Sequence, residues 1–306
     1  MNDAMIKDIA GKDFDRAYSK AVFKNIVSKF KGESNKLISF NEVMHYLKVK
    51  NESYGGMRYV PIDEIVGSEG RYNDFTREFL PDKQMLRRRW QSVDEAHLKD
   101  IILPPIKVYQ LGGVYFVRDG NHRVSVAKRQ GCDFIDAEVT DIQTDIKLTP
   151  GMSHEELMRI IIAHEKEIFL ENTKLDQYRD VSMLDFSCPG RFDDIMTHIC
   201  GHQYYMGIEK NGYVDFTEAM LNWYDTLYMP IIHEIEEHHI LRMFKDRTSS
   251  DLYLWVMAHW DEIKKRYGQD VPLSEAVESY GRQYGSRTML QRFFDFIKKL
   301  FGIKQE

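Results

Sequence analysis

Residues 114–131 have the pattern of a strand, a tight turn and a helix. Positions 114–117 are β-branched or aromatic, an Asp-Gly pair follows, and a helical pattern comes directly after it. The turn therefore lies at a helix N-terminus, where unpaired N–H groups and the helix dipole attract anions. Gly120 lets a ligand approach the backbone, and His122 and Arg123 add side-chain donors, which indicates a phosphate site. An ordinary βα turn with a solvated arginine and histidine has the same spacing.

A longer segment, residues 59–142, resembles the ParB/sulfiredoxin-like domain. Residues 60–65 resemble its opening strand, residues 105–109 its middle strand, and residues 120–123, Gly-Asn-His-Arg, its phosphate-binding turn. The resemblance implies a small α/β module that binds a nucleotide through this turn. The whole chain also resembles a poorly characterised bacterial family in which a helical region containing residues 248–255 follows this domain.

Members of that superfamily carry different versions of the turn. Partition proteins have an acidic, double-arginine version that binds CTP, sulfiredoxins have a catalytic cysteine before His-Arg, and free-serine kinases have Asp-Gly-His-His-Arg. Asn121 occupies the position of the sulfiredoxin cysteine, which excludes sulfiredoxin chemistry. Asp119, Gly120, His122 and Arg123 match the kinase version. The resemblance thus implies a small-molecule kinase or a nucleotide hydrolase.

The resemblance also assigns roles to individual residues. The residues expected to bind phosphate are Arg118, Gly120, Asn121, His122 and Arg123. Asp119 would orient the turn or help to hold a metal ion, and His122 would donate to phosphate or carry a proton.

Glu69 is the expected catalytic base, because it falls at about the position of a catalytic glutamate in the serine kinases. A carboxylate facing a bound terminal phosphate can orient or deprotonate an attacking hydroxyl. Glu69 belongs to a polar, glycine-rich segment, residues 67–75, that is expected to be a loop after the opening strand. A shift of register would replace it with Glu64 or Asp74, and each of the three also fits a solvated loop acid.

These roles define the expected ligands. ATP, ADP or CTP would bind with Mg²⁺ at the phosphates, and a small hydroxyl-bearing substrate would be the phosphate acceptor. The alternative is a nonenzymatic, nucleotide-switched regulator or a DNA-partition-like ParB-type binding protein. A helix-turn-helix with a basic recognition helix would favour that alternative, and the sequence contains no convincing one.

The charge of the chain makes nucleic acid an unexpected partner. The 306 residues include 42 lysines and arginines against 48 aspartates and glutamates, a net charge of −6, which argues against binding of nucleic acid through bulk charge. A basic helix is predicted at 81–96 with arginines at 87–89. Three consecutive arginines spread around a helix, which favours a solvated face. Arg87 or Arg89 lining the phosphate site is a further hypothesis.

The sequence indicates a cytoplasmic protein. Its cysteines, Cys132, Cys188 and Cys200, are too few and too scattered for a disulfide framework. No apolar run reaches the ~20 residues of a membrane span, and the first residues lack the layout of a signal peptide. The sequence does not indicate an oligomeric state.

The predicted fold class is α+β with three regions. Residues 1–56 form a helical N-terminal extension, residues 57–149 a small mixed-sheet ParB/sulfiredoxin-like domain, and residues 150–306 an all-helical domain. In the extension, a helix is predicted over 13–30, and Ser39 is expected to cap a second helix. A Gly-Gly pair at positions 55 and 56 is expected to break the chain before the first strand.

The helical domain is predicted from caps, breakers and apolar periodicity. Helices are expected at 153–170, 193–205, 216–241, 250–267 and 274–284. Ser153 begins a capping box, and Pro230 is expected to split or kink its helix. A last helix, 288–302, has an apolar stripe flanked by basic residues. It fits either a partner or membrane-surface contact or simple packing on its own domain.

Histidines in this domain raise the question of a metal site. His198 and His202 are four residues apart, on one helix face, and residues 233–239 hold further histidines and glutamates. The zincin pattern fails because Glu237 stands four residues after His233. Histidines that bond to neighbouring side chains or to water are favoured, and no metal ligand is predicted among them.

Overall fold

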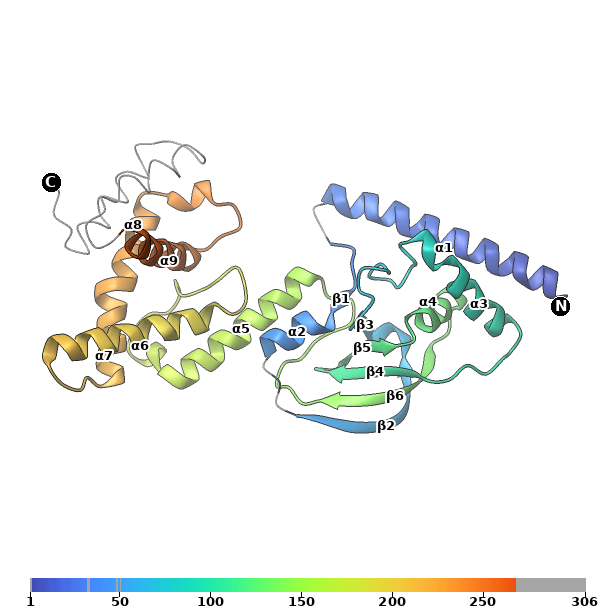
Figure 1. Cartoon of the computed structure of the whole chain (residues 1–306), viewed down its shortest axis with the longest axis horizontal. Helices are drawn as coiled ribbons and strands as arrows, with labels where there is room; N and C mark the ends of the chain where they lie inside the picture. Colours follow the sequence, from blue (N-terminus) through green and yellow to red (C-terminus); the bar gives the residue numbers. More distant parts are fainter. Residues whose placement is uncertain (1, 32–33, 48, 50, 268–306) are drawn as a thin grey trace. The chain divides into compact units, whose positions relative to one another are not determined.

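The computed structural model describes residues 2–31, 34–47, 49 and 51–267 (Figure 1). The chain divides into two compact units, a first that ends at Ile161 and a second that begins at Ile162. The first is built around a mixed sheet and the second from helices, so the fold class is α+β, as predicted. The predicted helices at 274–284 and 288–302 lie outside the described residues.

The first unit contains a six-stranded sheet with the order β1-β3-β5-β4-β6-β2. The strands are β1 (Ile38–Ser39), β2 (Glu52–Pro61), β3 (Ile65–Ser68), β4 (Ile106–Leu111), β5 (Val114–Asp119) and β6 (Phe134–Ile142). Strands β1, β3 and β5 are parallel, whereas β4 is antiparallel to β5 and parallel to β6, and β2 is antiparallel to β6. The carboxyl ends of β1, β3 and β5 therefore lie along one edge of the sheet.

Three predictions about the first strands were wrong. The Gly55-Gly56 pair does not break the chain, because β2 continues through it with a register shift between Tyr54 and Gly56. The expected opening strand 60–65 is divided by a 3₁₀ turn, Ile62–Glu64. β3 then includes Gly67, which had been expected in the loop. This position requires glycine, since a Cβ there would lie 2.4 Å from the carbonyl oxygen of Ile38 on β1.

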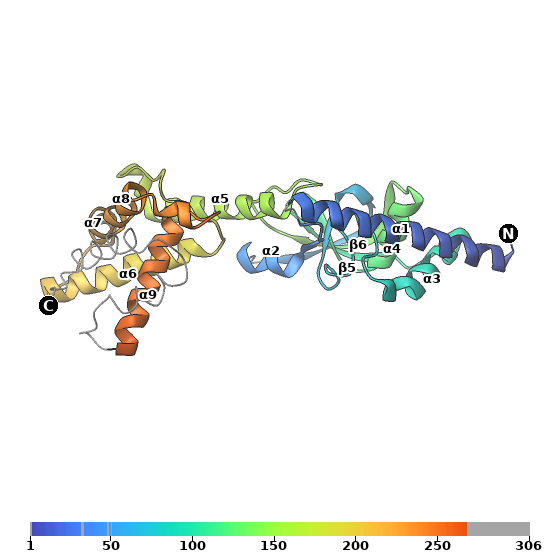
Figure 2. The same cartoon turned by 90° about the horizontal axis from the view of Figure 1, so that it is seen from above.

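Helices cover both faces of the sheet (Figures 1 and 2). One face packs against α1 (Asp3–Lys31), α3 (Arg87–Leu98) and α4 (Asn121–Gln130). The other packs against α2 (Phe40–Leu47) and the first turns of α5 (His154–Thr173). Along β5 the side chains alternate between the two cores, with Phe116 in one and Val117 in the other, as the two-residue period of a strand requires.

Helix capping followed the sequence closely. The N–H of Glu42 donates to the Ser39 hydroxyl at 3.4 Å at the start of α2. Ser153 and Glu156 form the predicted capping box of α5, with N–H to side-chain bonds of 2.7 and 3.1 Å. The basic helix begins later than predicted, at Arg87, after a 3₁₀ turn at Gln84–Leu86.

The second unit packs α6 (Arg191–Lys210), α7 (Phe216–Trp223), α8 (Met229–Glu237) and α9 (Ser249–Tyr267) together with the rest of α5. The predicted split at Pro230 is confirmed: a π-helical segment, Tyr224–Tyr228, separates α7 from α8. Proline has no N–H for the helical ladder, and π segments accommodate such interruptions.

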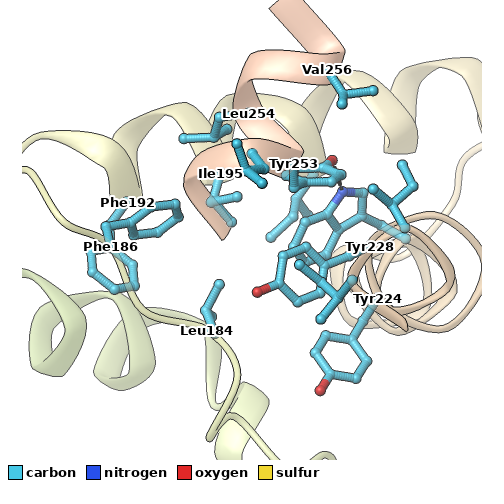
Figure 3. Close-up of a cluster of buried hydrophobic side chains, with 14 of the residues drawn as sticks. Leu184, Phe186, Phe192, Ile195, Tyr224, Tyr228, Tyr253, Leu254 and Val256 are labelled. Atoms are coloured by element: carbon cyan, nitrogen blue, oxygen red, sulfur yellow. Dashed lines mark hydrogen bonds between the residues drawn. The ribbon is translucent and has the colours of Figure 1, made fainter. Parts of the chain in front are cut away.

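An aromatic cluster forms the centre of this unit (Figure 3). Trp223, Tyr228 and Tyr253 are fully buried. The indole N–H of Trp223 donates to the Tyr253 hydroxyl at 2.9 Å, and the Tyr228 hydroxyl lies 2.7 Å from the Ser250 hydroxyl. The cluster therefore buries large rings without leaving these polar atoms unpaired.

Candidate functional site

The predicted strand, turn and helix are confirmed as β5, Gly120 and α4, and they stand at the carboxyl edge of the parallel strands. β3 ends beside β5, with Ser68 opposite Val117 and the Glu69 N–H bonded to the Val117 carbonyl at 3.0 Å. Gly120 has a φ of +107°, and a Cβ there would lie 2.4 Å from Cγ2 of Ile106. Only glycine fits this turn.

Arg123 ties the turn to the segment before β4. Its guanidinium donates to the carbonyl of Pro105 at 2.8 Å, to the carboxylate of Asp119 at 2.6 Å, and to the carbonyl of Pro104. These bonds use three of the five N–H donors of the side chain. Arg123 thus holds the shape of the turn and has reduced capacity to bind a phosphate directly.

Two buried polar atoms at the start of α4 have no hydrogen-bond partner in the part of the chain that the structure describes. They are Oδ1 of Asn121, a residue only 6% exposed, and Nδ1 of His122. The first intrahelical bond of α4 joins the Val124 N–H to the Gly120 carbonyl at 3.0 Å, so the N–H groups before it are available to a ligand. Because an unpaired buried polar group costs about 1–3 kcal/mol, these atoms mark a place where a ligand would be stabilised.

His122 is held neutral by its surroundings. Its ring packs edge-on against Phe75, with ring centroids 5.3 Å apart. Burial lowers the pKa of His122 to about 4, and the positive charges of Arg71 and Arg89 add to the effect. At pH 7 the neutral imidazole can donate and accept a hydrogen bond with a ligand, but it has no positive charge to attract a phosphate.

This burial predicts a pH dependence of stability. Below pH 6.5 the unfolded chain protonates His122, whereas the folded chain does so only near the lowered pKa of about 4. The stability contribution present above pH 6.5 is therefore lost as the pH falls from 6.5 to about 4. We expect the free energy of unfolding to fall by about 1–3 kcal/mol over this pH range, a value reduced because the ring is partly exposed.

His122→Gln should flatten this part of the pH profile, measured as hydrogen exchange of α4 amides between pH 4 and 7. The same substitution at His45, an exposed residue of α2, serves as the control. An unchanged profile for His122→Gln would contradict the burial of a neutral ring.

Glu69 lies at the same sheet edge, on the face of the sheet that α2 covers. The Tyr109 hydroxyl is 3.4 Å from a Glu69 carboxylate oxygen, and the Tyr109 ring stacks on Phe40 with centroids 4.1 Å apart. The guanidinium of Arg118 lies over the Tyr109 ring, 5.7 Å from its centroid. Burial and the charge of Glu69 raise the pKa of Tyr109, so its hydroxyl stays protonated as a donor. The structure thus brings together Glu69 and Arg118, both predicted site residues.

The alternatives to Glu69 differ in position and in partners. Glu64 belongs to the 3₁₀ turn before β3, at the opposite end of that strand. Asp74 accepts bonds from Arg71 at 3.0 Å and from Lys83 at 2.7 Å. Burial alone would raise the pKa of Asp74, but the bonds and charges of Lys83 and Arg71 together lower it. Asp74 is therefore an ion-pair partner, and Glu69 remains the candidate for the predicted base.

Among the arginines of α3, Arg89 is the one near the turn. Arg87 pairs with Asp15 of α1 and lies over the Phe14 ring at 4.8 Å, so it faces away from the site. Arg89 is exposed and acts electrostatically on His122, and no described residue forms an ion pair with it. Together with Arg71 it places positive charge near His122 at the α4 N-terminus.

No family model, curated protein or solved structure matches this chain.

Sequence reasoning missed Arg71 and Tyr109 as members of the site. Arg71 follows β3 in the predicted polar loop, where its N–H donates to the Ser68 hydroxyl at 3.3 Å. Its position directly after a strand was the available signal. Tyr109 lies inside a strand and is recognisable only from the pairing of β4 with β5.

Three histidines of the second unit have side-chain partners. His198 lies 3.2 Å from the Tyr253 hydroxyl, His202 lies 2.7 Å from the side-chain oxygen Oδ1 of Asn222, and His238 lies 3.1 Å from a carboxylate oxygen of Glu234. Within the described ranges, no group of three or more His, Cys, Asp or Glu side chains could hold a metal ion. None of the described helices has the length and apolar character needed to span a membrane.

Proposed function

We propose that this chain binds a nucleotide at the carboxyl edge of β3 and β5, as a cytoplasmic protein with a ParB/sulfiredoxin-like domain at residues 59–142. The observation that carries the proposal is the pair of buried, unpartnered atoms, Asn121 Oδ1 and His122 Nδ1, at the free N-terminus of α4. A nucleotide has hydrogen-bonding groups that match the unpaired groups at this edge of the sheet. Its phosphates match the helix N–H groups and nearby arginines, and its sugar and base carry donors for the buried acceptor.

The reaction best supported is phosphoryl transfer to a small hydroxyl-bearing substrate or to water. The acceptor oxygen bonds to the terminal phosphorus while the bond to the bridging oxygen breaks, and the hydroxyl proton passes to Glu69. The Tyr109 hydroxyl orients the Glu69 carboxylate. Arg118 and Arg89 offset the charge of the phosphates, and Arg123 keeps the turn in shape.

Mg²⁺ is the expected companion of the phosphates. This ion takes oxygen ligands and is commonly held by substrate phosphates with only one or two carboxylates. Asp119, whose side chain is 67% exposed, and Glu69 offer carboxylates at this edge.

Calorimetric titration with ATP, ADP, CTP and GTP, each with and without Mg²⁺, tests the proposal. At least one nucleotide should bind and raise the unfolding temperature, because a ligand that binds only the folded state stabilises it. Arg89→Ala should weaken that binding about tenfold, through loss of about 1.4 kcal/mol of charge-assisted interaction. Arg88→Ala, one position away on α3 and also exposed, is the matched control and should leave affinity unchanged.

Two outcomes would overturn the proposal. Wild-type protein that binds none of these nucleotides would leave the turn as a structural element only. Equal losses for Arg88→Ala and Arg89→Ala would indicate a diffuse charge effect rather than a site at the α4 N-terminus.

A further inference from the structure

A hollow lies in the same unit, at the end of α4 opposite to the phosphate turn. It has a volume of about 1490 Å³ and is bounded by the C-terminal half of α1, the turn between β2 and β3, and the segment from Lys128 to Phe134. Ligand pockets commonly measure about 300–1,000 Å³, so this one has room for a sizeable ligand. None of residues 118–123, which form the phosphate turn, lines it.

The charge around the hollow is predominantly positive. Six cationic side chains line it, Arg16, Lys20, Lys24, Arg77, Lys128 and Arg129, against three acidic ones, Asp63, Glu78 and Asp133. Lys20 and Lys24 both pair with the single carboxylate of Glu78. No described residue forms an ion pair with Arg77. An anion is therefore the ligand that this surface attracts.

Lys128 is a partly buried member of this group. Its Nζ donates to the Ile65 carbonyl at 3.3 Å and lies over the Phe79 ring, 5.0 Å from the centroid. Burial lowers the pKa of Lys128, although the charges of Asp63 and Glu78 partly oppose this. A half-buried ammonium that has no carboxylate within ion-pair distance among the described residues gains from an anionic headgroup beside it.

Apolar side chains make up much of the remaining wall. They include Ala17, Val27, Ile62, Leu80 and Met152. Phe23 of α1, which also lines the hollow, leaves 66% of its surface exposed. Val27 follows Phe23 by four residues on α1 and is only partly buried, so the two side chains form a continuous apolar strip along this wall.

From this combination we propose that the hollow binds an anionic amphiphile, with an acyl-like apolar body along Phe23 and Val27 and a carboxylate or phosphate headgroup at Lys128. The ligand class follows from two features together. The cationic side chains would by themselves bind any anion, and the apolar side chains would by themselves bind any apolar molecule. An anionic amphiphile contacts both groups of side chains at once.

The test is calorimetry of the full chain with monomeric dodecyl phosphate, dodecanoate, dodecanol and dodecyltrimethylammonium. The two anions should bind, and the neutral and cationic analogues should bind at least tenfold more weakly. Lys128→Met should weaken dodecyl phosphate binding at least tenfold, whereas Lys29→Met, an exposed lysine of α1 outside the hollow, should not. Phe23→Ala should also weaken binding, whereas Phe30→Ala, at a residue that is 88% exposed and outside the hollow, should not.

Several outcomes would overturn the inference. Equal binding of all four amphiphiles would show that the charge of the hollow plays no part. Unchanged affinity in Lys128→Met would place the headgroup elsewhere. Binding to anionic phospholipid vesicles that Phe30→Ala weakens and Lys128→Met does not would identify α1 as a membrane-surface helix instead of a wall of this hollow.

Discussion

Trp223→Ala is expected to destabilise the helical unit by about 3–5 kcal/mol, the usual cost of removing a large aromatic side chain from a core. Trp223 is fully buried, and its ring lies 5.1 Å from the ring of Tyr228 and 6.1 Å from that of Tyr253, centroid to centroid. The substitution opens a cavity and also removes the indole donor of the Tyr253 hydroxyl.

The measurement is hydrogen exchange of α6 to α8 in the full chain, which reports on this unit separately from the sheet unit. Trp223→Phe should lower the stability of the helical unit less than Trp223→Ala does, because phenylalanine keeps a buried aromatic ring at this position. Tyr213→Ala, at an aromatic residue of the same unit that is 87% exposed, should change stability by no more than about 0.5 kcal/mol. A loss below about 1 kcal/mol for Trp223→Ala would mean that the aromatic cluster does not hold the helices together.

Glu69→Gln is expected to lower phosphate transfer or release by roughly 10²-fold while nucleotide affinity stays nearly constant. The amide has almost the same shape as the carboxylate and can still accept a hydrogen bond from Tyr109, but it cannot take a proton from the attacking hydroxyl. Turnover and affinity are measured separately, by single-turnover kinetics and calorimetry with the nucleotide that binds best.

The controls use the acids that were alternatives to Glu69. Glu64→Gln, before β3, should leave both quantities unchanged. Asp74→Asn should weaken the ion pairs with Arg71 and Lys83 and thus act more on binding than on turnover. Wild-type protein that binds nucleotide but transfers phosphate to none of a broad panel of hydroxyl acceptors would instead favour the nonenzymatic regulator.

Local chemistry in the sequence was enough to predict the turn, two helix caps and the interruption at Pro230. The β-branched run before Gly120, the glycine itself and the helical pattern after it produced β5, the turn and α4. Ser39 and Ser153 cap their helices through bonds that span three residues, and Pro230 acts through its own missing N–H. Each of these interactions joins residues close in the chain, so a short window of sequence contains its cause.

Other features depended on contacts between distant segments. Gly67 extends β3 because the backbone of β1 passes close to it, and Arg123 clamps the turn because the segment before β4 offers its carbonyls there. The sequence predicted His122 as a donor to phosphate or a proton carrier, and only its burial against Phe75 shows that the imidazole is neutral at pH 7. Burial and charge at a side chain are set by whatever packs around it, which the tertiary structure decides and a local pattern does not contain.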